Sequence, residues 1–243
     1  MTDADNNVIA HRPLHGMFTM VPRHYDLVNN VITWSLDERW RKKAARECLV
    51  SNPEKVLDLC CGTGDLAIHL ARLSQNNVEL TGLDYSQPML DIANAKAQKA
   101  GMENRVSFIY GDAASLPFPD GHFDSVGISF AFRNLTYKNP LVNQYVAEVV
   151  RVLKPGGKFV IVETSQPKSK LIKNLFHLYL RWFAFGVGYL ISGNKGAYHY
   201  LAESASRFYT PKEIEELLLS ASFRRVTYQP ILFGAVGTHI AVK

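Results

Sequence analysis

The chain of 243 residues has few cysteines and no long hydrophobic run. Its three cysteines are Cys48, Cys60 and Cys61, and two of them are adjacent, so they form no disulfide framework and favour a reducing compartment. No apolar run reaches the roughly 18 residues of a membrane-spanning helix. The N-terminus is polar and lacks the apolar segment of a signal peptide. We therefore expect a cytoplasmic protein in which residues 1–17 form a disordered tail.

What is present is the composition of a globular protein, with 47% hydrophobic and 20% charged residues. At this length we expect a single domain over residues 18–243. His11 and His15 have the spacing of a helical ligand pair, but they lie in the polar tail, and we expect no metal site.

Strand and helix patterns alternate through the middle of the chain. Strands are predicted at 55–60, 78–83, 105–110, 123–129 and 157–163, and helices at 64–74, 87–100 and 140–153. Short links between these elements predict a parallel sheet wrapped by helices, which is an α/β fold. A helical cap over residues 18–50 precedes this unit. The Thr210-Pro211-Lys212-Glu213 capping box predicts a late helix, and two strands around Pro230 and Gly234 are expected to end the chain.

A basic and aromatic segment, residues 168–205, interrupts the alternation as a helical insertion. Between Thr164 and Ala202 the chain has five lysines or arginines, eight aromatic residues and no acidic residue. The net charge of the whole chain is +5, so the remainder is neutral overall. This pattern suits a nucleic acid, a membrane surface or a core helix with a solvated basic face. We expect a long apolar helix or a helix pair over 168–190, broken near Gly186 and Gly188.

The segment Asp58–Asp65 predicts a buried strand that ends in a glycine turn and then opens a helix. Gly62 and Gly64 allow a tight backbone turn that leaves room for a ligand. Asp84 follows Gly64 by 20 residues, the spacing that places a carboxylate beside a ribose in nucleotide-binding βαβ units. The loop therefore indicates a cofactor that contains adenosine, and by itself it leaves a nicotinamide dehydrogenase open.

Three carboxylates, Asp58, Asp84 and Asp112, follow the first three predicted strands. The carboxyl ends of parallel strands face one crevice, so these side chains are expected around a single cleft. Three carboxylates would repel a pyrophosphate and would favour a cationic cofactor such as S-adenosylmethionine. Asp58 is expected to orient a cationic or amino group, and a structural bond from Asp58 to the loop amides is compatible with that role.

Several motifs together resemble a known family. Five motifs resemble those of a class I S-adenosylmethionine methyltransferase, namely Val56–Asp65, Gly82-Leu83-Asp84-Tyr85-Ser86, Gly111-Asp112-Ala113, Leu116-Pro117-Phe118-Pro119 and Leu153-Lys154-Pro155-Gly156-Gly157. More specific stretches are similar to the ubiquinone/menaquinone biosynthesis C-methyltransferases, and they are Arg23–Asn30, Trp40-Arg41, Ile128–Leu135, Glu163–Pro167 and Tyr198–Ser204. The resemblance covers residues 18–243. It implies a Rossmann-like, mostly parallel seven-stranded sheet with helices on both faces and an antiparallel C-terminal strand.

The resemblance also implies the cofactor, S-adenosylmethionine, and its site. The positions that match cofactor contacts of the family are Thr63, Asp84, Asp112, Ala113 and Ser129, and Asp58, Gly62, Gly64 and Tyr85 complete our candidate set. Asp84 would bind the ribose hydroxyls and Asp112 the adenine amino group. The chain departs from the family pattern at Cys60, where Gly or Ala is usual, and at Asp112, where relatives often have Asn. We interpret Cys61 as a small buried residue and Cys60 as a small-residue substitution in the turn.

The reaction implied is methyl transfer to a ring carbon of a polyprenylated hydroquinone. Arg133 is our candidate to stabilise the phenolate, because a guanidinium stays protonated and is a poor base. Asn134 would orient the ring hydroxyl or a water molecule, while Tyr25 and Tyr200 would shape the pocket. His24 is an alternative base. The Cys-Cys-Gly-Thr-Gly loop favours a demethylmenaquinol acceptor and leaves the ubiquinone route open.

A polyprenyl quinol resides in the bilayer, so we expect residues 168–192 to line an apolar channel and to rest on the inner face of the membrane. No nucleic-acid partner is expected, and a homodimer is left open. The alternatives are a methyltransferase for another phenolic or lipid acceptor, an NAD-dependent oxidoreductase and an RNA-binding protein.

Overall fold

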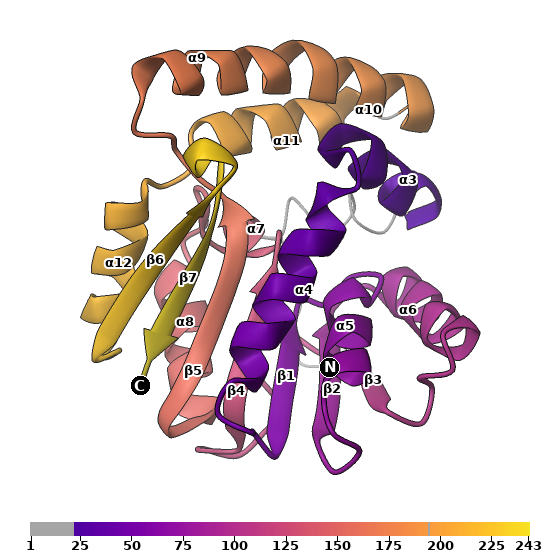
Figure 1. Cartoon of the computed structure of the whole chain (residues 1–243), viewed down its shortest axis with the longest axis vertical. Helices are drawn as coiled ribbons and strands as arrows, with labels where there is room; N and C mark the ends of the chain where they lie inside the picture. Colours follow the sequence, from indigo (N-terminus) through magenta and orange to yellow (C-terminus); the bar gives the residue numbers. More distant parts are fainter. Residues whose placement is uncertain (1–21, 194) are drawn as a thin grey trace, which may run out of the picture.

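The computed structural model describes residues 22–193 and 195–243, and the expected tail therefore lies outside the described residues. A seven-stranded sheet with the order β3-β2-β1-β4-β5-β7-β6 forms the centre of the molecule (Figure 1). Strand β7 runs antiparallel to both of its neighbours, and the pairs among β1 to β5 are parallel. In chain order the strands are β1 (Lys55–Leu59), β2 (Glu79–Asp84), β3 (Val106–Tyr110), β4 (Phe123–Ser129), β5 (Leu153–Thr164), β6 (Arg225–Ile231) and β7 (Val236–Val242). This arrangement confirms the predicted fold class.

Helices cover both faces of the sheet, and a further group lies over one of its ends (Figure 1). In chain order the helices are α3 (Pro22–Thr33), α4 (Leu36–Leu49), α5 (Asp65–Leu73), α6 (Gln87–Lys99), α7 (Phe132–Thr136), α8 (Val142–Val152), α9 (Lys170–Tyr179), the π-helical turn η1 (Leu180–Ala184), α10 (Phe185–Ser192), α11 (Lys195–Ser206), α12 (Pro211–Ser220) and the short 3₁₀ turn η2 (Leu232–Gly234). One apolar core lies between the sheet and α7, α8 and α12, and a second lies between the sheet and α4 and α5.

A third apolar cluster joins α3 to α9, η1, α10 and α11, and we call these elements the helical layer. Val28 and Ile32 of α3 pack there with Leu180 and Tyr198. The layer lies above the carboxyl ends of the parallel strands (Figure 1). It contains the segment that was expected as an insertion. No helix within the described residues is long and apolar enough to cross a membrane.

The N-terminal cap consists of two helices. Trp34 and Ser35 separate α3 from α4, and both have left-handed backbone angles, with φ of 55° and 56°. Such angles cannot continue a right-handed helix. Helix α4 therefore lies on the face of the sheet beside α5, while α3 turns into the helical layer (Figure 1).

The predicted break near Gly186 and Gly188 is wrong. The helix continues through both residues and ends at Gly193, which has a φ of 71°. Its irregular part is the π-helical turn η1, which precedes both glycines. Gly188 serves packing instead, because a Cβ there would lie 2.1 Å from the Cδ1 atom of Tyr198.

The capping box predicted at the start of α12 and the glycine turn predicted near β5 are both present. Thr210 and Glu213 form the capping box, in which the Thr210 Oγ1 accepts from the Glu213 amide at 3.3 Å. Gly156 has a φ of 78° at the predicted turn. There the pairing of β4 with β5 shifts register, so the turn lies inside the bounds of β5.

Candidate functional site

A small cavity of about 60 Å³ lies at the glycine loop, where β1, β2 and β4 end. Its lining residues are Arg41, Cys60, Cys61, Gly62, Thr63, Asp65, Asp84, Tyr85, Met89, Ser129, Phe130, Ala131, Asn134 and Leu135. Gly62 and Gly64 have φ of 53° and 81°, as the sharp turn requires. A Cβ on Gly64 would also lie 2.9 Å from the Phe108 ring. We call this cavity the loop cavity.

Asp84 ties the glycine loop to the end of β2. Its Oδ2 accepts the Gly62 amide and its Oδ1 accepts the Ser86 amide, both at 2.9 Å. Burial raises the pKa of the Asp84 carboxyl, and the amide hydrogen bonds oppose that shift. A carboxylate has about four lone-pair sites, so these amides leave room for a further donor. The group therefore suits the vicinal hydroxyls of a ribose.

The other two strand-end carboxylates are turned toward the backbone. Asp58 is 1% exposed, and its Oδ2 accepts the Ala67 amide in the first turn of α5 at 2.9 Å. Burial raises the pKa of Asp58 well above its usual value. The Asp112 Oδ1 accepts the Ala114 amide at 3.1 Å. Neither carboxylate lines the loop cavity, and neither does Ala113, whereas Thr63, Tyr85 and Ser129 do.

The surroundings of the adjacent Cys60 and Cys61 make both thiols unreactive. Burial raises the pKa of the Cys60 and Cys61 thiols well above the usual value, and the carboxylates of Asp58 and Asp84 add to the effect. Both thiols therefore stay protonated and are poor nucleophiles.

A large cavity of about 430 Å³ lies between the loop cavity and the helical layer, and we call it the upper cavity. Most of its lining is apolar, from Ile32, Trp40, Ile172, Leu175, Phe176, Tyr179, Leu180, Tyr198, Leu201, Leu232, Phe233 and Val236. Its polar lining includes Arg133, Asn134 and Tyr200. The upper cavity can hold an aromatic ring and part of an apolar chain, with a few polar groups at one place to orient them.

Arg133 is fixed by a buried ion pair at the start of α7. Its Nη1 lies 3.4 Å from the Glu163 Oε1 and donates to the Thr164 Oγ1 at 3.0 Å. The Arg133 amide also donates to the Glu163 Oε2 at 3.1 Å. Arg133 is 4% exposed and Glu163 is 1% exposed. The guanidinium is thus a rigid cation on the wall of an apolar cavity.

Three polar atoms near this wall have no hydrogen-bond partner of normal geometry among the described residues. They are the Arg133 Nε, the Asn134 Oδ1 and the Tyr200 hydroxyl. Burial raises the pKa of Tyr200, although the Arg133 guanidinium opposes the shift, so the hydroxyl stays neutral. Such atoms suit a polar ligand. Tyr25 lies in α3, and its side chain is outside the described part of the structure.

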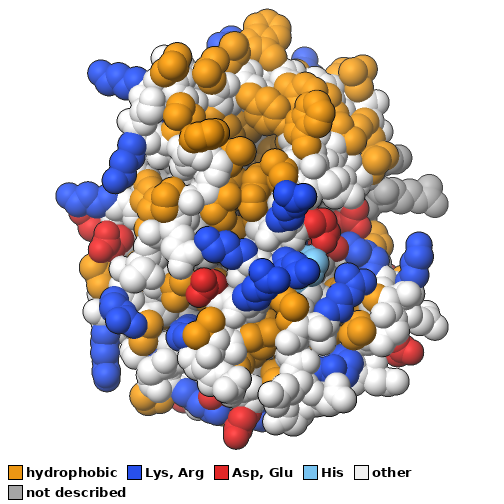
Figure 2. Space-filling view, in the orientation of Figure 1, with side chains coloured by type: hydrophobic (Ala, Val, Ile, Leu, Met, Phe, Trp, Pro, Cys, Tyr) orange, Lys and Arg blue, Asp and Glu red, His pale blue; other side chains and the backbone are white. Residues whose placement is uncertain are grey.

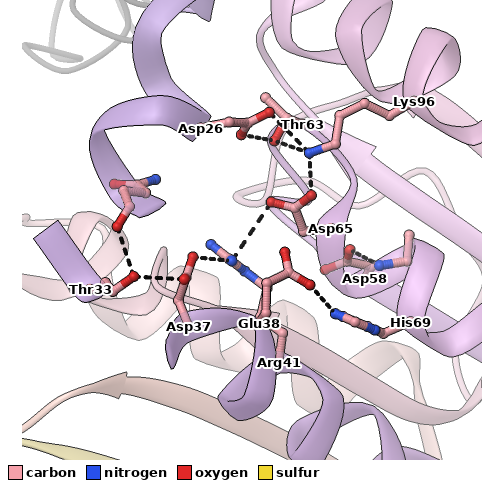
Figure 3. Close-up of polar contacts among 12 residues, drawn as sticks. Asp26, Thr33, Asp37, Glu38, Arg41, Asp58, Thr63, Asp65, His69 and Lys96 are labelled. Carbon is pink, nitrogen blue, oxygen red and sulfur yellow. Dashed lines mark hydrogen bonds and ion pairs between the residues drawn. The ribbon is translucent and has the colours of Figure 1, made fainter. Parts of the chain in front are cut away.

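Helix α3 is bonded to the glycine loop through side chains (Figure 3). Asp26 accepts from the Thr63 hydroxyl at 2.7 Å and from the Lys96 ammonium at 3.0 Å. Lys96 also pairs with Asp65, the first residue of α5. Helix α3 of the cap is therefore joined to the glycine loop and to α6 by polar and charged groups.

Sequence reasoning missed several residues of the site. Glu163 ends a parallel strand, as Asp58 and Asp84 do, so the strand-end rule could have indicated it. Asp26 and Arg41 lie in the family-like stretches Arg23–Asn30 and Trp40-Arg41, but the motifs assigned them no contact with the loop. Lys96 carries no such signal, because it comes from a helix that the fold alone brings to the loop.

The chain is similar to known proteins over nearly its whole length. The model described as the ubiE/COQ5 methyltransferase family matches residues 4–243. A demethylmenaquinone methyltransferase from Deinococcus radiodurans is 40% identical over 228 residues, which cover 93% of this chain and 91% of the relative. One from Thermus thermophilus is 39% identical over 225 residues, which cover 92% and 98%.

Among solved structures, an O-methyltransferase family protein from Burkholderia thailandensis aligns with a TM-score of 0.69 at 14% identity. The alignment covers 96% of this chain and 63% of that longer chain. A SAM-dependent methyltransferase from Aquifex aeolicus aligns with a TM-score of 0.56 at 19% identity, covering 78% and 81%. At these identities the likeness supports the fold.

Proposed function

This chain belongs to the ubiE/COQ5 methyltransferase family and is an S-adenosylmethionine-dependent C-methyltransferase, and we propose that its acceptor is a polyprenylated hydroquinone, namely demethylmenaquinol. The observation that carries the proposal is a pair of adjoining cavities with opposite character. The loop cavity contains carboxylates, the upper cavity is mostly apolar, and both are lined by Arg41, Phe130 and Asn134. The names of the relatives favour the naphthoquinol over the benzoquinol of the ubiquinone route.

The residues around the loop cavity fit the cofactor. Its sulfonium is a cation, and Asp65 and Asp84 line the cavity with negative charge. Asp84 would hold the ribose through the free lone pairs of its oxygens. The other residues proposed to hold the cofactor are Asp58, Gly62, Thr63, Gly64, Tyr85, Asp112, Ala113 and Ser129. When bound, S-adenosylmethionine supplies a methyl group activated by the positive sulfur, and the reaction needs no metal.

Arg133 would make the ring carbon nucleophilic by favouring ionisation of the quinol. A phenol with a pKa near 10 needs about 4 kcal/mol to be half ionised at pH 7. A buried guanidinium beside the ring oxygen stabilises the phenolate and stays protonated itself. We therefore assign Arg133 charge stabilisation rather than proton removal.

Asn134 and Tyr200 would orient the acceptor beside this cation. Asn134 lines both cavities, and its Oδ1 has no partner within the described residues, so it can accept a hydrogen bond from a ring hydroxyl or from water. The neutral Tyr200 hydroxyl can bond the second quinol oxygen. Tyr25 is proposed for the same pocket because of its place in the family motif. Fixing the ring in line with the methyl group can supply about 7–11 kcal/mol.

The prenyl tail calls for a membrane contact, and the surface of the helical layer suits one. Leu175, Leu178, Trp182 and Leu190 are each more than half exposed, as is Phe233 in the β6–β7 turn. Figure 2 shows hydrophobic side chains gathered over this layer. The basic residues of the same segment suit anionic head groups. We infer peripheral binding to the inner face of the cytoplasmic membrane.

The main test is a methyl-transfer assay with demethylmenaquinol and with the methoxy-benzoquinol of the ubiquinone route, read by mass spectrometry. We expect the naphthoquinol to gain one methyl group on carbon. Methylation of neither quinol, with turnover of another phenol, would overturn the proposed acceptor.

A flotation assay with anionic liposomes tests the membrane contact. Replacement of Lys170 and Lys173 by Glu should reduce binding at low salt. Lys99→Glu is the control, because Lys99 is an exposed residue at the end of α6, which is not part of the helical layer. Failure of the unmodified protein to bind at low salt would refute this part of the proposal. Light scattering in solution tests the homodimer.

A further inference from the structure

The upper cavity reaches the surface of the molecule at a mouth, which is marked by lining residues that are also exposed to solvent. These residues are Trp34 between α3 and α4, Leu175 on α9, and Leu232 and Phe233 in the β6–β7 turn. All four are large and apolar, and Phe233 is 80% exposed. The polar atoms that would hold the quinol ring, on Arg133, Asn134 and Tyr200, are buried instead. A ring bound to them would lie inside, with the mouth as the way out for a long substituent.

The size of the upper cavity limits how much of the acceptor it can hold. Its volume of about 430 Å³ is in the lower part of the range of about 300–1,000 Å³ that is typical of sites for drug-sized ligands. It can hold the ring and the start of the prenyl tail. The rest of a polyprenyl tail must therefore cross the mouth and lie outside the cavity.

The β6–β7 turn at this mouth has an unusual backbone and composition. Leu232 and Phe233, which we call the turn tip, have φ of 47° and 56°. These left-handed angles are unfavourable for bulky residues, and turns that need them usually contain Gly, Asn or Asp. The sequence has no Asp, Glu, Lys or Arg from Val226 to Val242. Strained backbone and exposed apolar side chains are both features of binding segments, so the turn tip needs a partner that is apolar.

The base of the turn is fixed, which gives its tip a defined place. The Ser165 amide donates to the Ala235 carbonyl at 2.9 Å, and the Ala235 amide donates to the Leu232 carbonyl at 3.0 Å. Pro167, which precedes α9, lies close to Gly234, because a Cβ on that glycine would be 3.4 Å from the Pro167 Cα. The turn therefore reaches the helical layer near the start of α9 (Figure 1).

Helix α9 extends the apolar surface outward from the mouth. Leu171, Leu175 and Leu178 are each more than half exposed, and their spacing of four and three residues places them on one face of the helix. Leu175 belongs both to this face and to the lining of the upper cavity. A tail that leaves the cavity here meets apolar side chains on both sides.

We propose that the turn tip is the point at which the prenyl tail of the acceptor passes between the bilayer and the upper cavity. Phe233 enters the bilayer at this point, and the tail runs between the turn tip and Leu175. The inference rests on the proposed quinol acceptor, and it adds a defined route for the tail to the membrane contact of the helical layer.

The test compares two demethylmenaquinols that differ only in the tail. One has a long tail and is supplied in anionic liposomes, and the other has a single isoprene unit and is supplied in buffer. The variant is Phe233→Asn, because Asn tolerates the left-handed backbone angle. It should raise the KM for the long-tailed quinol by about 10-fold or more, the effect of losing one aromatic side chain from an apolar medium, with kcat unchanged.

The short-tailed quinol and a second variant are the controls. With the short-tailed quinol, Phe233→Asn should leave kcat and KM within about twofold of the unmodified values. Val50→Asn replaces another exposed apolar residue, which follows the end of α4 that lies away from the helical layer, and it should change neither reaction (Figure 1). A long-tailed quinol with a photoreactive group on its third isoprene unit should label the turn tip or α9, and labelling confined to other elements would overturn the route.

The remaining outcomes separate this inference from the proposed acceptor. If the unmodified protein methylates neither quinol, the acceptor is wrong and the route falls with it. If it methylates both, and Phe233→Asn changes neither reaction or both equally, the route is refuted and the acceptor stands. A dimer in lipid-free buffer that Phe233→Asn converts to a monomer would make the turn tip a contact between copies and would also overturn the proposal. Should Phe233→Asn fail to fold, Leu232→Asn should give the same selective rise in KM.

Discussion

Replacement of Arg133 by Gln should slow methyl transfer while cofactor affinity stays nearly constant. The Arg133 side chain lines the upper cavity and does not line the loop cavity. If the guanidinium donates one charged hydrogen bond to the phenolate, its loss costs about 1.5–3 kcal/mol of transition-state stabilisation. Turnover should therefore fall by about 10- to 150-fold.

The same change also affects stability, and the structure indicates how to separate the two effects. Removing one partner of a buried ion pair costs about 3–5 kcal/mol when the other charge is left alone. Glu163 would retain the Arg133 amide at 3.1 Å and the Thr164 amide at 2.8 Å, so the cost should lie at the lower end of that range. A second substitution, Glu163→Gln, removes the remaining charge. The double variant should recover thermal stability and should stay slow.

The assay measures turnover with the quinol against pH, together with S-adenosylhomocysteine affinity by calorimetry. In the variant the rate should keep rising at pH values where the unmodified enzyme has levelled off, because the phenol now ionises at its ordinary pKa near 10. A fall in cofactor affinity by the same factor as turnover would refute the role assigned to Arg133. So would a normal rate at pH 7.

Three further predictions concern stability and reactivity. Burial lowers the pKa of His239 from 6.5 to about 4, so the unfolded state binds the proton more tightly than the native state. The contribution of the neutral imidazole to the free energy of unfolding is therefore fully present above pH 6.5. It is lost as the pH falls toward 4, by about 3 kcal/mol at most. Thermal unfolding of His239→Leu should have less of this acid dependence than the unmodified protein, and identical pH profiles would contradict the assignment. Gly188→Ala should destabilise the protein by about 1–3 kcal/mol in chemical denaturation, because the new Cβ would clash with Tyr198. Gly186→Ala is the control and should be neutral or stabilising, because no atom lies within 4 Å of the new Cβ. Equal effects of the two substitutions would show that the contact with Tyr198 is unimportant. The Cys60 thiol, whose pKa is raised, should react slowly with a thiol reagent at pH 8 in the native state and rapidly after unfolding. Fast labelling of the native protein would argue against its protonated state.

The sequence allowed prediction of those parts of the site that depend on one βαβ unit. The 20-residue spacing from Gly64 to Asp84 predicted a carboxylate beside the glycine turn, and Asp84 does accept the Gly62 amide there. This contact follows from local geometry, because a parallel neighbour strand must end beside the first. Strand patterns likewise predicted the sheet, since the alternation of strand and helix permits few arrangements.

Other features depend on contacts that no local pattern encodes. Lys96 and Asp26 are 70 positions apart in sequence, and they meet because α3 folds back over the loop. Gly188 suggested a helix break because glycine is flexible, but its real constraint is the ring of Tyr198 on a neighbouring helix. Such packing becomes visible only when the helices are placed together.

The loop cavity is proposed to hold the cofactor and the upper cavity the acceptor, and the residues shared by the two cavities therefore matter for the reaction. Methyl transfer requires the sulfonium side and the ring side to meet at one place, and within the described residues that place is the wall formed by Arg41, Phe130 and Asn134. All three residues belong to family-like stretches, but the sequence suggested a role only for Asn134, as a ligand of the acceptor. The structure shows how the other two are fixed: Arg41 is paired with Asp37, and Phe130 is held in a left-handed turn. A wall so constrained from both sides can fix the relative position of donor and acceptor, which is the main contribution that a protein makes to a reaction whose electrophile is already activated.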